Sequence, residues 1–346
     1  FKEALLIGQA PDYGLYVPVL IPKISNEKIK EFGNMPYYGI AFEIMKGYVS
    51  EEEIPADVLY QLCKQAYNFP VPIKKVPPDF FLLYLTKGPT ASFKDFAARL
   101  MARMMNYIAS KENKNLTILV ATSGDTGGAV ADAFFGLDNI EVVILFPEKE
   151  ITERQRKQMT TLGGNICAIA LQGTFDDCQA MVKRAFNDPA LNGKNLTSAN
   201  SINIGRLIPQ SVYYFKAYCE IGASKIAFSV PCGNFGNLMG GVLAREMGLP
   251  VEKFIVAVNE NDEFPRFLQT GIYKPVVPSK KCSSNAMNVG HPSNLARLID
   301  FYGGWLMDER DADGNLIKKG VLKKTPDMDL MRKHFVSFSI KDEWVD

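Results

Sequence analysis

Short apolar runs that alternate with helical patterns most limit what this chain can fold into. Five runs have the length and the Val, Ile and Leu content of strands buried on both faces, namely 116–121, 141–146, 166–171, 225–230 and 254–258. Apolar residues at helical spacing between the runs predict helices over 96–109, 126–135, 152–161, 175–186, 209–219 and 238–247. Because strands that alternate with helices form parallel sheets, we predict an α/β fold.

The two ends of the chain depart from this central pattern. Residues 1–75 mix a Pro-punctuated loop with helical spacing, and the stretch PVPIKKVPPDF closes that region. Phe1 lies inside a helical pattern, so we expect the native chain to begin before it. Residues 305–346 are charged, and we expect them to be irregular.

Composition excludes several classes of function. A formal charge of +1 over 346 residues provides no basic surface for nucleic acid, and no apolar run is long enough to cross a membrane. The six cysteines form no CxxC pair, which indicates reduced, mostly buried thiols and a cytoplasmic protein. With only two histidines, a Ser–His–Asp triad or a histidine-rich metal centre has almost no raw material, and we predict no metal site.

Two strand–loop–helix junctions, at 122–128 and 231–237, are rich in glycine. Glycine permits a tight turn, and the free N–H groups of the following helix can bind phosphate or carboxylate. A single such loop is explained about as well by the needs of the connection itself. The stretch GPTASFKD has Phe and Asp where a P-loop needs Gly before and Ser or Thr after the lysine, and the glycines at 233, 236, 240 and 241 are not spaced as GxGxxG. We therefore do not expect nucleotide binding by those routes.

The segment NSINIGR at 200–206 places amide, hydroxyl and guanidinium groups close together. Arginine offers a planar fork for phosphate or carboxylate, so this segment is a candidate anion clamp. The alternative interpretation is a helix cap followed by a surface arginine.

Lys94 lies between Phe93 and Phe96, at the point where a Gly/Pro-rich loop becomes a helix. Partial burial and the positive end of the helix both favour the neutral amine that covalent or general-base catalysis requires. A lysine that extends past the aromatic rings to water is the alternative. Two anion loops beside such a lysine favour an enzyme that uses pyridoxal 5'-phosphate (PLP).

Four motifs in order, GPTASFKDF, ATSGDTGGAVADAF, SANSINIGRL and VPCGNFGNLMGG, resemble threonine synthases of the fold-type-II PLP family. The resemblance is close over about 80–260 and weaker in the N-terminal region. It implies parallel sheets flanked by helices in two lobes, with an added N-terminal region. The implied domains are 1–78, a large PLP-binding domain of 79–110 and 205–346, and a small substrate-loop domain of 111–204.

The resemblance also implies roles for single residues. Lys94 would bind PLP covalently and act as the catalytic base, with Asp125 on the O3′ side of the cofactor. The cofactor phosphate would be held by Gly233, Asn234, Phe235, Gly236 and Asn237. The substrate would be bound by Ser123, Gly124, Thr126, Asn200, Ser201 and Arg206.

The implied reaction converts O-phosphohomoserine and water into threonine and phosphate, which makes the enzyme a carbon–oxygen lyase acting on phosphates. Another fold-type-II lyase, such as a dehydratase or phospho-lyase, and a non-catalytic fragment that lacks PLP are the alternatives. The family also carries a Ser or Thr that faces the pyridine nitrogen, and no segment after Phe301 matches it. We therefore expect a chain shortened at its C-terminal end, with weakened PLP binding and turnover.

Overall fold

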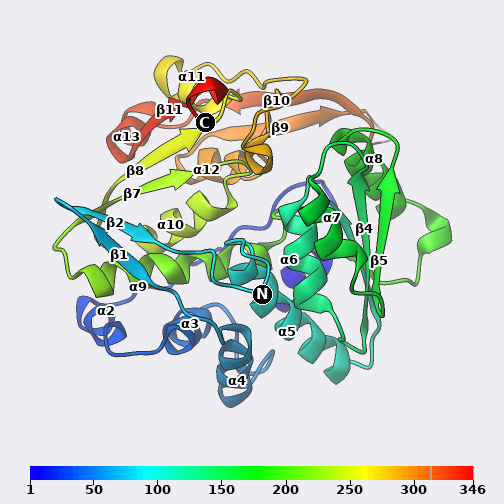
Figure 1. The fold of residues 1–346 in the computed structure, drawn as a ribbon, viewed down its shortest axis with the longest axis horizontal. Helices are drawn as coiled ribbons and strands as arrows, with labels where there is room; N and C mark the ends of the chain where they lie inside the picture. The colour runs from blue at the N-terminus through cyan, green and yellow to red at the C-terminus, as the bar shows by residue number, and fades with distance from the viewer. Residues whose placement is uncertain (312–313, 346) are drawn as a thin grey trace. The chain divides into compact units, whose positions relative to one another are not determined.

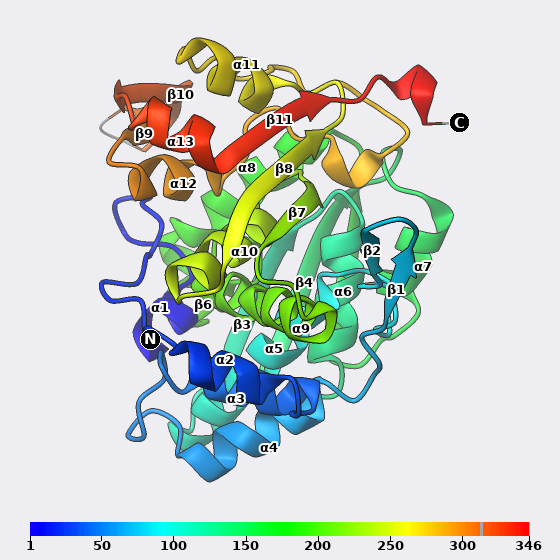
Figure 2. The same ribbon diagram turned by 90° about the vertical axis from the view of Figure 1, so that its left-hand side faces the viewer.

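The computed structural model describes residues 1–311 and 314–345. Contacts between residues divide the chain into two units, Phe1–Gly222 and Ala223–Asp346. Figure 1 labels most of the helices and strands of both units along the ribbon, and Figure 2 adds labels for α1, β3 and β6.

The first unit carries most of the helices. Its α-helices are α1 (Lys2–Ile7), α2 (Asn26–Phe32), α3 (Tyr37–Met45), α4 (Ala56–Ala66), α5 (Asp95–Lys111), α6 (Asp125–Phe134), α7 (Glu153–Thr160), α8 (Phe175–Phe186) and α9 (Val212–Ile221). Its strands are β1 (Ile73–Val76), β2 (Phe80–Leu83), β3 (Leu116–Ala121), β4 (Ile140–Pro147), β5 (Ile166–Leu171) and β6 (Leu196–Ser198). Short 3-10 turns are η1 (Pro189–Leu191), η2 (Ile204–Arg206) and η3 (Ile208–Ser211).

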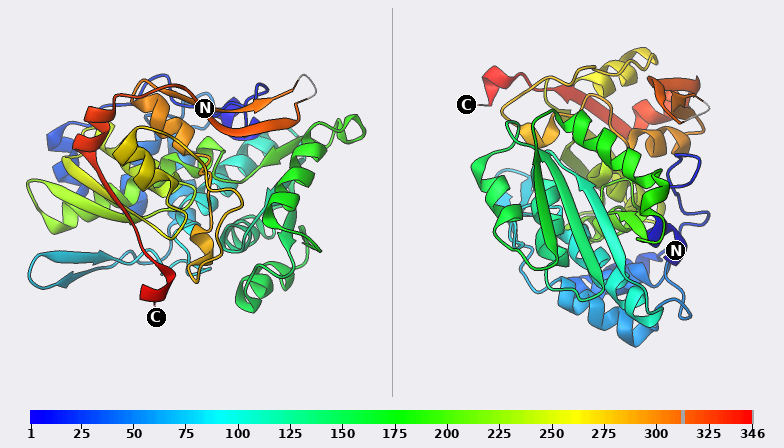
Figure 3. Two further views of the ribbon diagram at one scale, coloured as in Figure 1. Left: turned by 90° about the horizontal axis from the view of Figure 1, so that it is seen from above. Right: turned by 90° about the vertical axis from the view of Figure 1, so that its right-hand side faces the viewer.

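A parallel sheet with the order β5-β4-β3-β6 forms the centre of this unit. Side chains alternate between its faces, so Leu119 and Leu145 pack against Cys178 of α8 on one face. Ile118 and Ile144 point to the other face, where α6 contacts β4. Figure 3 shows α8 lying across the sheet. Burial on both faces explains the continuous apolar runs of β3 and β4, whereas β5 lies at the edge of the sheet and is largely exposed. The predicted parallel α/β arrangement is confirmed.

Aromatic rings join the N-terminal helices to α5. Phe96, which is 0% exposed, packs edge-on against Tyr37, Phe69 and Tyr213, with ring centroids 5.1–5.7 Å apart. The hydroxyl of Tyr67 donates to the Phe96 carbonyl at 2.7 Å. Tyr37 of α3 and Tyr67, which follows α4, are therefore packed onto the helix that Lys94 precedes.

The second unit is smaller. Its strands are β7 (Ile226–Pro231), β8 (Val251–Val258), β9 (Trp305–Arg310), β10 (Leu316–Lys324) and β11 (Phe335–Ser339). Its helices are α10 (Gly236–Glu246), α11 (Glu263–Thr270), α12 (Leu295–Phe301) and α13 (Met328–His334), with 3-10 turns η4 (Asn285–Met287) and η5 (Asp342–Trp344). Strands β7, β8 and β11 lie side by side in a parallel sheet, as Figure 2 shows.

The expectation that 305–346 is irregular was wrong. Strands β9 and β10 form an antiparallel pair, and β11 extends the parallel sheet beyond β8. Phe335 anchors β11 by stacking on Phe254 at 5.7 Å between ring centroids. Ser337 and Ser339 alternate with its apolar residues, and Val336 and Phe338 are exposed, so the strand lacks the continuous apolar run of a buried one.

A buried acid lies at the start of α11. Glu263 is 1% exposed, and its Oε2 has no hydrogen-bond partner among the residues that the structure describes. Burial raises the pKa of this carboxyl from 4.5 to about 8, and the nearby Asp262 adds to the rise. At neutral pH the side chain is therefore mostly protonated.

The five predicted strands and six predicted helices are confirmed, with boundaries shifted by a few residues. Strands β1 and β2 form an antiparallel hairpin that the sequence pattern did not indicate, because the prolines at 70–80 are typical of a loop. All six cysteines are free, and four of them are buried, as predicted. Over the described residues, no helix combines the length and apolar character needed to cross a membrane.

Candidate active site

Lys94 ends a loop that is folded around a buried carboxylate. Asp95 is 0% exposed, and it accepts hydrogen bonds from the Thr90 backbone N–H at 2.9 Å and the Thr90 hydroxyl at 2.6 Å. A side chain at Gly88 would overlap the Asp95 carboxylate, so only glycine fits there. The loop is thus held in place, and Lys94 becomes the N-cap residue of α5, at the helix start predicted for it.

The amine of Lys94 is enclosed rather than extended into water. Its side chain is 15% exposed, and Nζ lies 3.5 Å from Asp125 Oδ2 and 4.7 Å from the ring centroid of Phe93. Burial lowers the pKa of Lys94, Asp125 opposes the decrease, and the Arg206 charge adds to it. The alternative of a lysine extended past the rings to water is therefore wrong, and burial shifts Lys94 toward the neutral amine relative to an exposed lysine.

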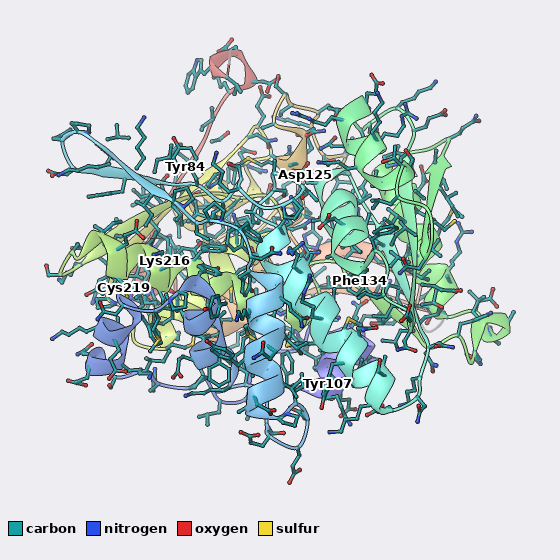
Figure 4. All side chains as sticks on the ribbon, turned by 60° about the horizontal axis from the view of Figure 1, so that its bottom comes forward. Tyr84, Tyr107, Asp125, Phe134, Lys216 and Cys219 are labelled. Atoms are coloured by element: carbon teal, nitrogen blue, oxygen red, sulfur yellow. The ribbon has the colours of Figure 1, made fainter. Side chains whose placement is uncertain are left out.

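Asp125 is the first residue of α6, as labelled in Figure 4. The turn before it is closed by Thr122, whose hydroxyl accepts from the N–H groups of Gly124 and Gly127, both at 2.9 Å. Gly124 has φ +133, a conformation that residues with a Cβ rarely adopt. The N–H groups of Gly124 and Gly127, which the sequence analysis offered as anion donors, therefore bind Thr122 instead. They stabilise the turn and fix the position of Asp125.

Gln155 of α7 holds the other side of the Asp125 carboxylate. Its Nε2 donates to Asp125 Oδ1 at 2.7 Å, while its Oε1 accepts from the Thr152 N–H at 3.0 Å in a capping box. One turn later, Gln158 Nε2 donates to the Thr90 carbonyl at 3.1 Å. Helix α7 thereby contacts both the Lys94 loop and the Asp125 turn.

Glycines of α6 make this approach of α7 possible. A Cβ at Gly127 would overlap Met159 Sδ and lie 2.7 Å from Thr122 Cγ2. A Cβ at Gly128 would lie 2.8 Å from Gln158 Oε1. The glycines of GDTGG therefore serve helix packing as well as the turn.

Gly127→Ala is expected to destabilise the fold by about 1–3 kcal/mol, because the added methyl group has no space between α6 and α7. Urea unfolding monitored by far-ultraviolet circular dichroism measures this. Gly39→Ala in α3 is the matched control, since a Cβ there meets only ordinary contacts at 3.5 Å and beyond. Equal stability of Gly127→Ala and the wild type would contradict the packing described here.

In the 200–206 segment, residues 203–206 are buried and residues 200–202 are half-buried. Arg206 is 2% exposed, and its Nη1 donates to the Ala199 carbonyl at 2.7 Å. Its Nε finds no acceptor within the described part of the chain. Burial lowers the Arg206 pKa to about 10, against an opposing effect of Asp95. The alternative interpretation, a helix cap followed by a surface arginine, is correct about the cap, because Asn203 caps η2. It is wrong about the arginine, because Arg206 is buried.

Amides around Arg206 fix the backbone of the segment. Asn200 Nδ2 donates to the Ala121 carbonyl at 2.8 Å, which ties the segment to the end of β3. Asn203 is 0% exposed, and its Nδ2 donates to the carbonyls of Leu5 at 2.8 Å and Ser198 at 2.9 Å. The guanidinium is therefore presented by a rigid, inward-facing turn.

The 233–237 loop of the second unit joins β7 to α10. Phe235 is buried, and its backbone adopts the left-handed conformation with φ +63. No side chain caps the start of α10. Asn234 accepts through its carbonyl from Asn294 Nδ2 at 3.0 Å, which fixes the turn. Among the described residues, the N–H groups from Gly233 to Gly236 have no acceptor, so they can bind an anion at this helix start.

The first unit thus brings Asp125 and Arg206 within electrostatic reach of Lys94. Ser123, Thr126 and Ser201, which the sequence also indicated, are half-buried on the same turns. The predicted phosphate loop at 233–237 belongs to the second unit. No cluster of His, Cys, Asp and Glu suited to a metal was found in the described ranges.

Gln155 and Thr122 escaped prediction from the sequence. The pattern TERQ at 152–155 indicates a helix start, but it carries no sign that the glutamine also reaches Asp125. Thr122 is part of a recognised motif, yet its role in closing the turn depends on the geometry of Gly124. Both contacts are tertiary.

Comparison with protein families gives two matches. A model described as "Pyridoxal-phosphate dependent enzyme" matches residues 70–312, and one described as "Threonine synthase N terminus" matches residues 1–67. Together they span most of the chain.

Individual relatives agree. The chain is 43% identical to the threonine synthase of Buchnera aphidicola from Acyrthosiphon pisum over 307 residues, covering 87% of this chain and 71% of that protein. It is also 43% identical to the Escherichia coli K12 threonine synthase over 306 residues, with the same coverage. A solved structure of PLP-bound threonine synthase from Brucella melitensis superposes with a TM-score of 0.88 at 35% identity, covering 98% of this chain and 75% of that one.

Proposed function

The chain belongs to the threonine synthase family of PLP-dependent enzymes, and we propose that its substrate is O-phosphohomoserine. The enzyme is a PLP-dependent lyase of threonine biosynthesis. In the proposed reaction, O-phosphohomoserine and water give threonine and phosphate, which is the work of a carbon–oxygen lyase acting on phosphates.

The residues present fit PLP, which offers an aldehyde and a phosphate. A buried lysine with a lowered pKa suits the aldehyde, because a neutral amine is the nucleophile. A helix start with unpartnered N–H groups, at 233–236, suits a phosphate. In this proposal Lys94 binds PLP, Asp125 contacts its O3′ side, and Gly233, Asn234, Phe235, Gly236 and Asn237 hold its phosphate.

PLP supplies an electron sink for the electron pair left when a substrate proton is removed. In the proposed mechanism, the Lys94 amine removes the proton from the α-carbon of the substrate and returns protons in later steps. Its buried position favours the neutral form that can accept a proton, and the nearby Arg206 charge disfavours the ammonium form. Asp125 gives the protonated amine a counter-ion 3.5 Å away, which partly compensates the charge that the amine gains.

Arg206 is the proposed partner of the substrate phosphate, which leaves from the γ-carbon. Its Nε is a buried donor without an acceptor, so an anion would complete its hydrogen bonds. Asn200 and Ser201 begin the same segment, and Ser123, Gly124 and Thr126 form the facing turn proposed for substrate binding. The single observation that carries the substrate proposal is this buried, incompletely partnered guanidinium.

Phosphate release tests the proposal. The chain, incubated with PLP and O-phosphohomoserine, should release inorganic phosphate and form threonine in equal amounts. L-serine and L-threonine, given separately, test for a dehydratase, which would produce 2-oxo acids. Formation of oxo acids without phosphate release from O-phosphohomoserine would replace the proposed reaction with the dehydratase.

Arg206→Ala is expected to weaken substrate binding about tenfold to a hundredfold or more, because a charge-assisted hydrogen bond contributes roughly 1.5–3 kcal/mol. PLP binding, followed by its absorbance, should change much less. The KM for O-phosphohomoserine and the dissociation constant of PLP are measured on the same variant. Arg206→Lys is the control that keeps the charge but loses the fork. Equal losses of PLP and substrate binding would assign Arg206 to the cofactor or the fold.

Two further proposals concern the whole protein. We place it in the cytoplasm, since its six cysteines are free thiols. The division into 1–78, 79–110 with 205–346, and 111–204 stays a prediction about which parts move together. Limited proteolysis with and without O-phosphohomoserine tests it, because a mobile 111–204 domain should gain protection when substrate binds.

A further inference from the structure

Asp125 lies between two donors that hold it unequally. Gln155 Nε2 reaches Asp125 Oδ1 at 2.7 Å, the length of a strong hydrogen bond to a carboxylate. Lys94 Nζ stands 3.5 Å from the other oxygen, which is long for an ammonium–carboxylate contact. The carboxylate is therefore drawn toward α7 and stops short of a tight ion pair with Lys94.

We propose that Gln155 is a positioning residue that restrains the Asp125 carboxylate and so keeps Lys94 out of a close ion pair. The proposal deepens the proposed function, since it matters to turnover only if Lys94 carries the chemistry. The contact itself is independent of the reaction.

The position of Gln155 is built into the fold. Its Oε1 is held by the Thr152 N–H at 3.0 Å and the Thr152 hydroxyl at 3.1 Å, so the amide is fixed with Nε2 toward Asp125. Gly124 is required for this approach, because a Cβ there would overlap the Gln155 amide. Gln158 anchors the same helix to the Lys94 loop through the Thr90 carbonyl.

The charges around Lys94 decide what loss of this restraint does. Asp125 of α6 raises the pKa of Lys94, Arg206 of η2 lowers it, and Asp95 of α5 raises it, against a dominant decrease from burial. If Gln155 no longer holds Oδ1, the freed carboxylate can approach the nearest cation, which is Lys94. The ammonium form of Lys94 is then stabilised, and its pKa rises.

The reactivity of Lys94 in the cofactor-free chain tests this directly. Formaldehyde with cyanoborohydride methylates neutral amines, and mass spectrometry gives the rate at Lys94 relative to the exposed Lys87 from pH 6 to 10. In Gln155→Met, we expect the Lys94 profile to move to higher pH and its labelling to slow severalfold at neutral pH. In Asp125→Asn, which removes the counter-ion, the profile should move the other way.

Two further variants separate positioning from folding. Thr152→Ala removes the hydroxyl half of the capping box but keeps the bond from the residue 152 N–H to Gln155 Oε1, so the Gln155 amide still reaches Asp125 and the profile should match the wild type. In the Asp125→Asn background, Gln155→Met should shift the profile no further, because its effect passes through the carboxylate. A shift in that background, an equal shift in Thr152→Ala, or an unchanged profile in Gln155→Met would each overturn the proposal. Failure of phosphate release in the wild type would instead refute the proposed function.

Discussion

Lys94→Ala is expected to lower phosphate release from O-phosphohomoserine by about 10³-fold or more. The variant loses the amine that binds PLP and moves the substrate proton, and a positioned acid–base group alone contributes about 10²–10⁴-fold. The fold should survive, since Asp95 and not Lys94 fixes the loop through its bonds to Thr90. Release is measured with saturating PLP, and far-ultraviolet circular dichroism confirms folding.

Borohydride reduction in the presence of PLP, followed by peptide mapping, identifies the lysine that binds the cofactor. Lys87→Ala is the matched control, because Lys87 lies in the same loop but is exposed. It should keep both label and turnover. A label that remains on another lysine with unchanged turnover in Lys94→Ala would refute the assignment.

Glu263→Gln should make the protein more stable than the wild type at alkaline pH. The folded carboxyl has a pKa near 8 against 4.5 as reference, so the folded state binds more protons than the unfolded state between these values. Stability of the wild type therefore falls as pH rises through that window, and the neutral amide avoids the loss. At 1.4 kcal/mol per tenfold change in proton affinity, the difference at pH 9 is on the order of 4 kcal/mol.

Urea unfolding at pH 5, 7 and 9 measures this difference. Near pH 5 the two proteins should unfold at similar urea concentrations, and the difference between their midpoints should increase as the pH rises. Glu252→Gln, at an exposed position in the same unit, is the control and should follow the wild type. Parallel stability profiles for Glu263→Gln and the wild type would show that the carboxyl is already ionised at a tolerable cost.

Much of the fold follows from periodicity, because buried parallel strands leave a continuous apolar run. The strand at 116–121 and the helix at 175–186 have the predicted bounds. Strand β11 was missed because Ser337 and Ser339 interrupt its apolar residues, so the sequence shows no continuous apolar run there. Its place is determined by a partner, β8, some eighty residues earlier.

The residues of the candidate site also differ in whether the local sequence predicts them. Lys94 could be predicted because its neighbours in sequence, a glycine-rich loop and two phenylalanines, already describe an unusual lysine. Phe93 does contact the amine, whereas Phe96 packs into the cluster of aromatic rings around Tyr37 and Tyr213. The burial of Arg206 and the reach of Gln155 arise only when helices dock, and no local pattern encodes them.

The bond from Asn203 to the Leu5 carbonyl spans 198 residues of sequence. During synthesis α1 therefore emerges long before the amide that anchors it, with Leu5, 0% exposed in the final fold, still in contact with water. A nascent chain halted before Asn203 should leave its first helix open to proteolysis, and one released after Arg206 should protect it. The first helix and the turn that carries Arg206 should then become ordered together. Arg206 would be positioned to bind an anion only after α1 has docked against that turn.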